Sequence, residues 1–226
     1  MSVLVVAAHP DDEVLGCGGT ISRLTQEGQK VYVAIMGEGV TSRYAEEKDA
    51  DTEMVERLHE CSYRVSEALG VCELSMHSLP DNRFDTVPLL DIVKIVEELI
   101  EEIKPSIVYT HHAGDLNVDH SLLSRAVLTA TRPVPDSVVK TVYAFEIPSS
   151  TECTFQHLEP SFRPNTFFDI SKHIDVKVDA MNMYEAEVRP FPHPRSSEAL
   201  RAIAAKWGST VGLRAAEAFE LIRSTV

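Results

Sequence analysis

The first residues that could do chemistry are His9, Asp11 and Asp12, which come directly after the apolar run of residues 3–8. A short run of Val, Leu and Ala without alternation is typical of a central parallel strand, because such a strand is buried on both faces. Its carboxyl end is the edge where open α/β sheets bind ligands. His9 and Asp12 could share a divalent ion there, with Asp11 turned toward a metal-bound water. In the structural alternative, Asp12 only caps the next helix and His9 is a hydrogen-bonded loop residue.

A second polar cluster, HHAGDLNVDH at residues 111–120, follows another predicted strand at residues 106–110, and a helix is predicted to begin near Asp119. We expect the two clusters to meet at one edge of the sheet. A His-x-x-Asp pair with a distant His supplies two imidazoles and one carboxylate and leaves positions open for water and substrate, as in catalytic zinc sites. The structural alternative stays open, because a single His is more often a surface or core residue and Asp119 could serve only as a helix cap.

This set of side chains favours hydrolysis. Zinc bound in this way lowers the pKa of its water toward ~7 and polarises a carbonyl, so that an amide can be attacked at neutral pH. Asp11 is the expected base, which takes the proton from the water and returns it to the leaving amine. His112, Asn117 and His193 are the candidates for a hydrogen-bond donor to the oxyanion.

Strand and helix patterns alternate along the first half of the chain. Besides the strands at 3–8 and 106–110, the pattern predicts strands at 30–36 and 71–76 and helices at 12–26, 46–69 and 87–103. Such alternation indicates a parallel sheet with helices on both faces, joined by right-handed crossovers. The expected fold class is therefore α/β, a Rossmann-like three-layer fold with a mostly parallel central sheet.

The second half of the chain is less regular. Strands are expected at 143–147 and 166–170, and helices at 175–187 and 198–223. The irregular stretch 148–164 is expected to form a flap beside the site.

The glycine-rich stretch Gly16-Cys17-Gly18-Gly19 is not interpreted as a dinucleotide fingerprint. It falls inside a predicted helix, and acidic residues stand where a pyrophosphate would need hydrogen-bond donors. We expect these glycines to let the helix pack closely on the sheet, with Cys17 as a small packing residue.

Composition limits the class of protein. The 226 residues are 44% hydrophobic and 25% charged, as expected for an ordinary globular protein, here of one domain spanning residues 1–226. A net charge of −14 without a run of Lys and Arg argues against nucleic acid as a partner. The apolar runs are strand-sized and the start does not look like a secretory leader, so we expect a cytoplasmic protein without membrane insertion. The four cysteines form no C-x-x-C pair and are predicted to be reduced and mostly buried.

Residues 8–20, AHPDDEVLGCGGT, resemble the opening motif of the LmbE-like, or PIG-L, deacetylase family, and the second cluster resembles its downstream Asp-His motif. Residues 192–196 (PHPRS) and 216–219 (AEAF) are similar to the end of bacterial and archaeal members, so the resemblance extends over most of the chain. Members are zinc-dependent hydrolases that remove acetyl groups from N-acetylglucosamine units in sugars, glycolipids and thiol conjugates. The resemblance implies that His9, Asp12 and His120 bind metal and that Asp11 is the general base.

One position departs from the family pattern. In several members the downstream motif reads His-Pro-Asp-His and its first His helps to stabilise the oxyanion, whereas Asn117 stands at that place here. An Asn amide can donate a hydrogen bond but cannot act as a charged acid, so His112 and His193 stay as alternatives. In some oligomeric members a His from a neighbouring subunit completes the site. His193 could be such a residue, and a homo-oligomer is a plausible assembly.

Substrate contacts are expected from loops at the same edge. Arg43 follows the second predicted strand, Asp81, Asn82 and Arg83 follow the third, and His112 follows the fourth. They could bind sugar hydroxyls or a phosphate, whereas ordinary turn chemistry and solvated charge are the structural alternative.

The resulting hypothesis is a zinc hydrolase, with ferrous iron as a second metal candidate, that removes an acetyl group from an N-acetylated sugar or sugar conjugate. Two alternatives stay open. One is a catalytically inactive sugar- or nucleotide-binding protein on the same fold. The other is a non-haem iron oxygenase, whose ligand set is also two His and one carboxylate.

Overall fold

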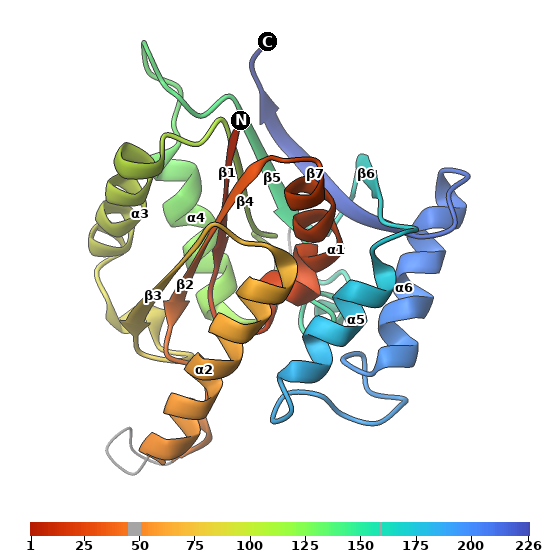
Figure 1. The fold of residues 1–226 in the computed structure, drawn as a ribbon. Helices are drawn as coiled ribbons and strands as arrows, with labels where there is room; N and C mark the ends of the chain where they lie inside the picture. The colour runs from red at the N-terminus through yellow and green to blue at the C-terminus, as the bar shows by residue number, and fades with distance from the viewer. Residues whose placement is uncertain (45–50, 159) are drawn as a thin grey trace.

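A computed structural model describes residues 1–44, 51–158 and 160–226. The apolar run forms β1 (Ser2–Ala7), an interior strand of a seven-stranded sheet of order β3-β2-β1-β4-β5-β7-β6 (Figure 1). The other strands are β2 (Lys30–Gly37), β3 (Glu73–Leu79), β4 (Ile107–His111), β5 (Thr141–Phe145), β6 (Thr166–Asp169) and β7 (Ala216–Ser224). The helices are α1 (Asp12–Gln26), α2 (Thr52–Leu69), α3 (Leu89–Ile103), α4 (Val118–Ala130), α5 (Ile174–Met183) and α6 (Ser197–Thr210). Short 3-10 helices are η1 (Thr41–Arg43), η3 (Phe84–Thr86) and η4 (Thr151–Thr154).

The strand pairing confirms the expected fold class. β3, β2, β1, β4 and β5 pair in parallel, and only β7 runs antiparallel, between β5 and β6. Parallel neighbours need helical crossovers, which is why helices cover both faces. The sheet is α/β and mostly parallel.

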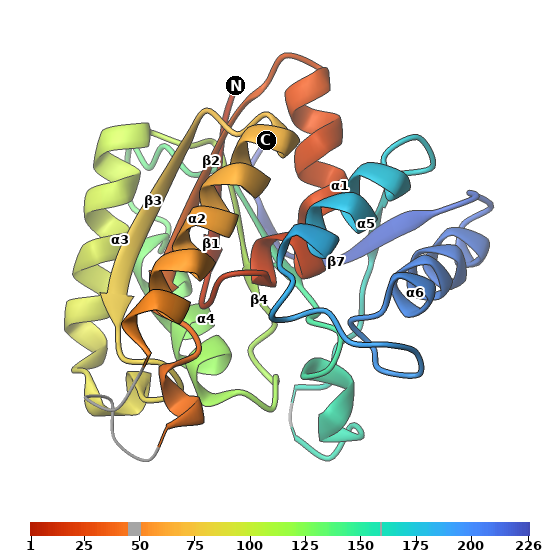
Figure 2. The ribbon, with the colours of Figure 1, turned by 60° about the horizontal axis from the view of Figure 1, so that its bottom comes forward.

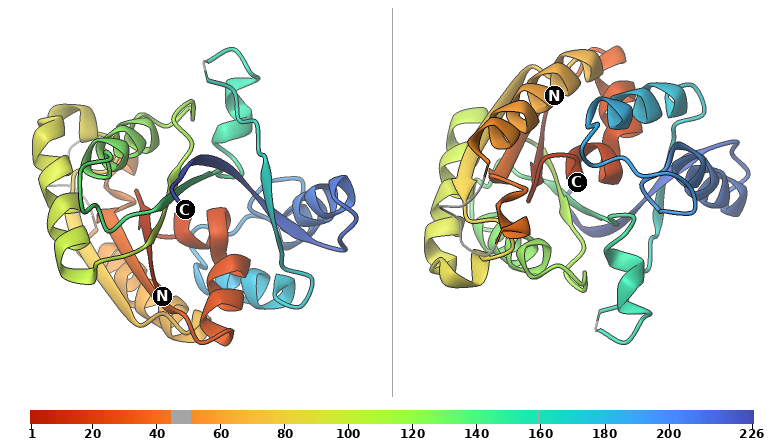
Figure 3. Two further views of the ribbon diagram at one scale, coloured as in Figure 1. Left: turned by 90° about the horizontal axis from the view of Figure 1, so that it is seen from above. Right: turned by 90° about the horizontal axis from the view of Figure 1, so that it is seen from below.

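Residues of β1 alternate between two cores. Val3 and Val5 pack in the core beneath α1, α2 and α5, whereas Leu4 and Val6 pack in the core beneath α3 and α4 (Figure 3). Both faces of the strand are therefore buried, which explains why its sequence lacks the alternation of a half-exposed strand.

Close packing of α1 on the sheet confirms the interpretation of its glycines. A Cβ atom at Gly16 would collide with the ring of Phe145 on β5, and one at Gly19 would lie 2.9 Å from Ile170. Cys17 between them is fully buried. The prediction that the cysteines are mostly buried is wrong, however, because Cys72 is exposed and Cys61 and Cys153 are only partly buried.

The helix predicted at 198–223 is also wrong. α6 ends at Thr210, Gly212 turns the chain at φ 77°, and β7 begins at Ala216. Helix-forming residues such as Ala and Glu adopt a strand here because β7 gains hydrogen-bonded neighbours on both sides, which outweighs local propensity. Smaller differences concern the third strand, which runs as Glu73–Leu79 and not 71–76, and the helix predicted from 46, of which 46–50 lie outside the described residues.

The parallel strands direct their carboxyl ends to one end of the molecule. Figure 2 turns this end toward the viewer and shows the loop between β1 and α1. Within the described parts of the chain, no helix has the length and apolar character needed to cross a membrane.

Candidate metal and catalytic site

The loop between β1 and α1 has a constrained backbone. The backbone N–H of His9 donates to Asp12 Oδ2 at 2.9 Å, and Asp11 adopts a left-handed conformation with φ 96°. A residue with a side chain rarely adopts that conformation, so the surrounding structure must hold it. The consequence is that Asp11 and Asp12, although adjacent, present their carboxylates to different partners.

His9, Asp12 and His120 meet at one point. Asp12 Oδ2 lies 3.4 Å from His9 Nδ1 and 3.2 Å from His120 Nε2, and one ligand atom from each residue lies within 4.8 Å of the other two. His120 comes from the first turns of α4, after β4. Because β4 pairs directly with β1, the two polar clusters are brought together, as the sequence predicts.

The other ring nitrogen of each histidine faces a carboxylate. His9 Nε2 lies 2.9 Å from Asp119 Oδ2, and His120 Nδ1 lies 3.1 Å from Asp115 Oδ1. A carboxylate behind an imidazole keeps the proton on the nitrogen that it contacts, so the opposite nitrogen is free to bind a cation. His9 would bind through Nδ1 and His120 through Nε2, both directed at Asp12.

These residues fit a divalent cation. Both ring nitrogens of His120 are buried, and within the described residues neither has a hydrogen bond of good geometry. Buried polar atoms without such partners are costly, and a cation at the meeting point would satisfy Nε2. Two imidazole nitrogens and one carboxylate oxygen, with further positions open, form the donor set of catalytic zinc sites and also suit ferrous iron.

Asp81 and Asp119 also surround His9. Asp81 Oδ1 lies 3.3 Å from His9 Nε2, so His9, Asp81 and Asp119 form a second group of potential ligands. Their remaining oxygens are already used, since Asp81 Oδ2 accepts the backbone N–H of Ser42 and Asp119 Oδ1 accepts that of Phe84. We therefore interpret Asp81 and Asp119 as residues that orient the imidazole ring of His9.

The carboxylates set the electrostatics of the cluster. Burial lowers the pKa of His9, but hydrogen bonds to Asp119 and Asp12 outweigh it and raise the pKa to about 10. For His120, burial is likewise outweighed by Asp12 and Asp115, and its pKa rises to about 9. Burial alone would raise the pKa of Asp12, but His120 and His9 hold it well below the usual range. The buried carboxylates around the two imidazoles therefore favour positive charge at this point.

His111 packs against the cluster of His9, Asp12 and His120 but is not part of it. Its Nε2 accepts the backbone N–H of Ala8 at 2.8 Å, and its ring stacks on that of His120 with centroids 4.1 Å apart. Burial and the neighbouring His120 hold the pKa of His111 well below its usual value, so its ring is neutral. His111 links the end of β1 to His120 and is not one of the clustered ligands.

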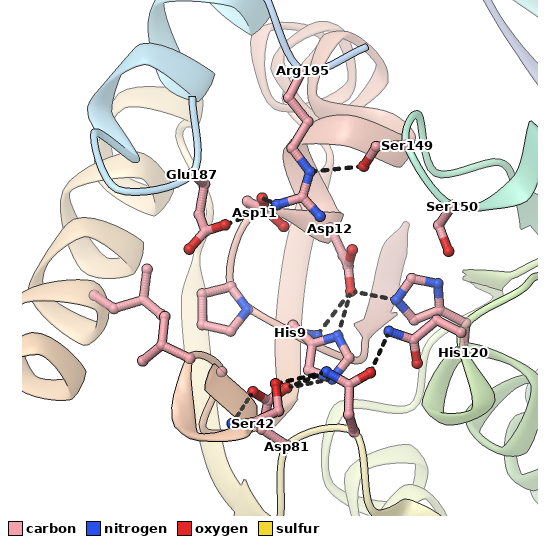
Figure 4. Close-up of a pocket in the computed structure, with 16 residues that line it drawn as sticks. His9, Asp11, Asp12, Ser42, Asp81, His120, Ser149, Ser150, Glu187 and Arg195 are labelled. Atoms are coloured by element: carbon pink, nitrogen blue, oxygen red, sulfur yellow. Dashed lines mark hydrogen bonds and ion pairs between the residues drawn. The ribbon is translucent and has the colours of Figure 1, made fainter. Parts of the chain in front are cut away.

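Asp11 is paired with an arginine. Arg195 Nη1 donates to Asp11 Oδ2 at 2.7 Å and to Glu187 Oε2 at 2.9 Å (Figure 4). Burial raises the pKa of Asp11 well above its usual range, although the positive charge of Arg195 opposes the shift. A carboxylate with a raised pKa is a stronger base, which is the property that proton abstraction from water requires.

A cavity of about 210 Å³ opens over these groups (Figure 4). Seven of the predicted site residues are among those that line it: His9, Asp11, Asp12, Asp81, Asn82, Asn117 and His120. Ser149 and Ser150 also line the cavity, so the flap predicted at 148–164 does border the site. The cavity therefore combines the cation cluster, the candidate base and several loop residues.

Three predicted residues lie elsewhere among the described residues. Arg83 is exposed and does not line the cavity. His112 does not line it either, because its ring nitrogens lie 2.7 Å from Glu220 Oε2 and 2.8 Å from the Pro160 carbonyl oxygen. His193 is also outside the lining, and its Nδ1 accepts the backbone N–H of Arg195. The geometry gives no support to a substrate contact by Arg83 or His112, and the side chain of Arg43 lies outside the described part of the chain.

Comparisons with known proteins identify the family of the chain. The family model described as PIG-L: GlcNAc-PI de-N-acetylase matches residues 4–131, more than half of the chain. The chain belongs to the PIG-L family. The matched region contains the whole cation cluster and Asp11.

Relatives in the PIG-L family match most of the chain. An uncharacterised deacetylase of Escherichia coli K12, YaiS, is 28% identical over 81% of this chain and 90% of its own length. The diacetylchitobiose deacetylase of Thermococcus kodakarensis is 25% identical over 97% of this chain and 82% of its own length. A solved structure of the N,N'-diacetylchitobiose deacetylase from Pyrococcus horikoshii has a TM-score of 0.78, 19% identity, and covers 98% of this chain and 84% of its own. That likeness shows a shared fold.

Sequence reasoning missed Arg195, Glu187 and Asp115. Arg195 stands in the PHPRS segment, one of the stretches that resemble PIG-L proteins, but nothing in its local sequence shows that it reaches Asp11. Glu187 has no signal in the sequence. Asp115 lies in the second cluster, and only the fold reveals that it faces His120.

Proposed function

We propose that this PIG-L protein is a metal-dependent hydrolase that removes the acetyl group from an N-acetylglucosamine-type sugar or sugar conjugate. One observation carries the proposal: the buried carboxylate of Asp11 stands next to the His9–Asp12–His120 cluster in one cavity. Related proteins named as deacetylases, including one for diacetylchitobiose, support this reaction class.

His9, Asp12 and His120 would hold the cation. When bound there, a zinc or ferrous ion lowers the pKa of water and polarises an acyl carbonyl. Asp11 takes the proton of the attacking water and later delivers it to the leaving amine. Asp119 and Asp115 keep His9 and His120 in the tautomers that direct Nδ1 and Nε2 toward Asp12.

The cavity suits the end of a sugar. Its volume of about 210 Å³ is below the roughly 300–1,000 Å³ of pockets that enclose drug-sized ligands, so the acetamido end of one sugar unit would enter while the rest of the substrate stays outside. Asn82 and Ser42 at the cavity offer amide and hydroxyl groups that can bind sugar hydroxyls, whereas the carboxylate of Asp81 is engaged with His9 and Ser42.

The test is acetate release from a panel of substrates: N-acetylglucosamine, N,N'-diacetylchitobiose, and nucleotide-linked and lipid-linked N-acetyl sugars, each with zinc and with ferrous iron. We expect turnover of at least one substrate. Saturable sugar binding without acetate release across the panel would instead favour a non-catalytic binding protein.

Asp11→Asn is the matched variant for this assay. Asn keeps the shape and can still accept a hydrogen bond from Arg195, but it is not a base. We expect metal content to stay unchanged by elemental analysis and turnover to fall by about 10²–10⁴-fold, the usual contribution of general acid–base catalysis. Near-wild-type turnover would reject Asp11 as the base.

A further inference from the structure

The position expected to stabilise negative charge on the acyl oxygen holds an uncharged residue here. Asn117 stands where several PIG-L proteins have His, and its side chain is occupied as a helix cap. Its Oδ1 accepts the backbone N–H of Asp119, and its Nδ2 donates to Asn82 Oδ1. One Nδ2 hydrogen therefore remains for a substrate, and it belongs to an uncharged amide.

The other two candidates are also engaged. His112 contacts Glu220 and the Pro160 carbonyl oxygen and lies outside the cavity lining. His193 is likewise outside the lining. A permanently charged donor is offered by Arg195, on another part of the cavity wall.

Arg195 on that wall is held in a fixed orientation. Its Nε donates to Ser149 Oγ at 2.9 Å, and its Nη1 donates to Asp11 Oδ2 and to Glu187 Oε2. The side chain is 23% exposed and lines the cavity. These contacts use Nε and Nη1, and Figure 4 shows the second terminal nitrogen of the guanidinium, Nη2, directed into the cavity toward Asp12.

We propose that Arg195 is a catalytic residue whose Nη2–H donates a hydrogen bond to the acyl oxygen of the substrate as that oxygen becomes negative. The inference rests on the proposed amide hydrolysis. As the water oxygen bonds to the acyl carbon, the π pair of the carbonyl moves onto the acyl oxygen and one water proton goes to Asp11. The carbonyl then re-forms, the C–N bond breaks, and its electron pair takes the proton from Asp11, giving the free amine and acetic acid, which releases the second water proton to solvent and leaves as acetate.

The charge balance around Arg195 favours this role. Asp11 loses its negative charge on the Nη1 side when it takes the proton, and a negative charge appears on the acyl oxygen on the Nη2 side. The guanidinium therefore exchanges one anionic partner for another without moving. A preorganised donor aimed at developing negative charge stabilises the transition state, and the guanidinium of Arg195 is permanently charged.

Three variants test the inference in the metal-loaded protein. Arg195→Met removes all donors. Arg195→Lys keeps one positive charge, but its compact ammonium cannot occupy the positions of both Nη1 and Nη2, so while it pairs with Asp11 and Glu187 no donor stands at the place of Nη2. Arg189→Met is the matched control, because Arg189 is exposed and, among the described residues, donates to the carbonyl oxygens of Ala186 and Val188.

Two measurements distinguish direct contact of Arg195 with the acyl oxygen from an indirect effect of Arg195 on Asp11. The first is kcat/KM for the best substrate of the panel. The second is the Kd, by calorimetry, of an analogue of glucosamine that carries an N-methylphosphonyl group, a tetrahedral anion that needs no base. In Arg195→Met we expect kcat/KM to fall and Kd to rise by similar factors of about 10²–10³, the range for loss of one oxyanion donor. Bound metal should stay unchanged, and Arg189→Met should match the wild type.

The inference is overturned if kcat/KM falls while Kd changes less than about threefold, because Arg195 would then act only by orienting Asp11. It is also overturned if neither value changes. If Arg195→Met does not fold, Arg195→Lys decides, and wild-type values in that variant reject the proposed donor. A wild-type protein without turnover of any substrate would instead contradict the proposed function itself.

Discussion

At the scale of single residues, the site depends on carboxylates that stand behind its imidazoles. Asp119 contacts the far nitrogen of His9, and Asp115 contacts that of His120. Asp115 also accepts hydrogen bonds from the hydroxyls of Ser150 and Thr151, so it ties His120 to the flap. The orientation of each candidate ligand is therefore set by residues that would not touch the cation.

His120→Ala should lose bound metal, because it removes one of two imidazoles and leaves only His9 and Asp12 at the meeting point. We expect the metal-to-protein ratio, measured by elemental analysis after dialysis, to fall from near one to near zero. His157→Ala is the control, since His157 is exposed on the flap, and its ratio should equal that of the wild type. An unchanged ratio in His120→Ala would remove His120 from the ligand set.

The residues that sequence reasoning could place are those close to the end of an apolar strand. His9, Asp11 and Asp12 follow β1 directly, and strand pairing then makes His120 their neighbour. Arg195 could not be placed in this way, because it reaches Asp11 from a loop more than 180 residues further along the chain. Its position depends on the packing of α5 and the following loop, which no local pattern encodes.

At the scale of elements, α1 is two helical segments joined at a kink. Cys17 has non-helical angles, φ −149° and ψ 23°, so the ladder of hydrogen bonds is broken there. Glu217 of β7 accepts the freed N–H groups of Gly19 and Thr20, and Lys177 of α5 donates to the Leu15 carbonyl oxygen and to Glu217. A buried ion pair thus caps both segments and fixes the direction in which α1 leaves the site.

Glu217→Gln should destabilise the fold, because it leaves the buried Lys177 ammonium without a counter-charge. Breaking one side of a buried pair costs about 3–5 kcal/mol, which chemical denaturation would measure as a lower free energy of unfolding. In the double variant Glu217→Gln/Lys177→Met we expect part of the loss to be recovered. The control is Glu53→Gln, whose pair with Arg57 is 76% exposed on both sides and should contribute little. An unchanged unfolding midpoint in Glu217→Gln would contradict this account of the kink.

β7, the strand that carries Glu217, is an element that could not be predicted from local sequence. The alternation of strands and helices up to β4 was sufficient to predict the fold class, because each pattern is local. β7 was predicted as helix, since its Ala and Glu residues favour helix and its two partners lie about 50 and 80 residues earlier in the chain. Pairing with two strands that are distant in sequence determines the structure of β7. The same pairing places Glu217, which caps α1, and local sequence did not predict its position.

At the scale of the whole molecule, a bound cation would join segments that are otherwise linked only through the sheet. The cluster connects the loop after β1 to α4, and Asp119 and Asp115 extend it to η3 and the flap. Binding that occurs only in the folded state stabilises that state.

Removal of the metal should therefore lower the melting temperature. A cation present at 100 times its Kd adds about 2.7 kcal/mol, which corresponds to a difference of roughly 5–10 °C for a chain of this size. Differential scanning calorimetry with and without a chelator would measure it. His120→Ala should show no such difference, and equal melting temperatures for the two forms of the wild type would argue against a structural contribution of the ion.

The two halves of the cluster also emerge from the ribosome at different times. His9 and Asp12 are synthesised first, but their imidazole partner on α4 follows only after three further strands, and β1 gains β4 as a neighbour only then. A nascent polypeptide that ends before α4 lacks the third ligand and should not retain the ion. Translation therefore has to pass His120 before all three candidate ligands exist to hold a cation, and Arg195 is added still later.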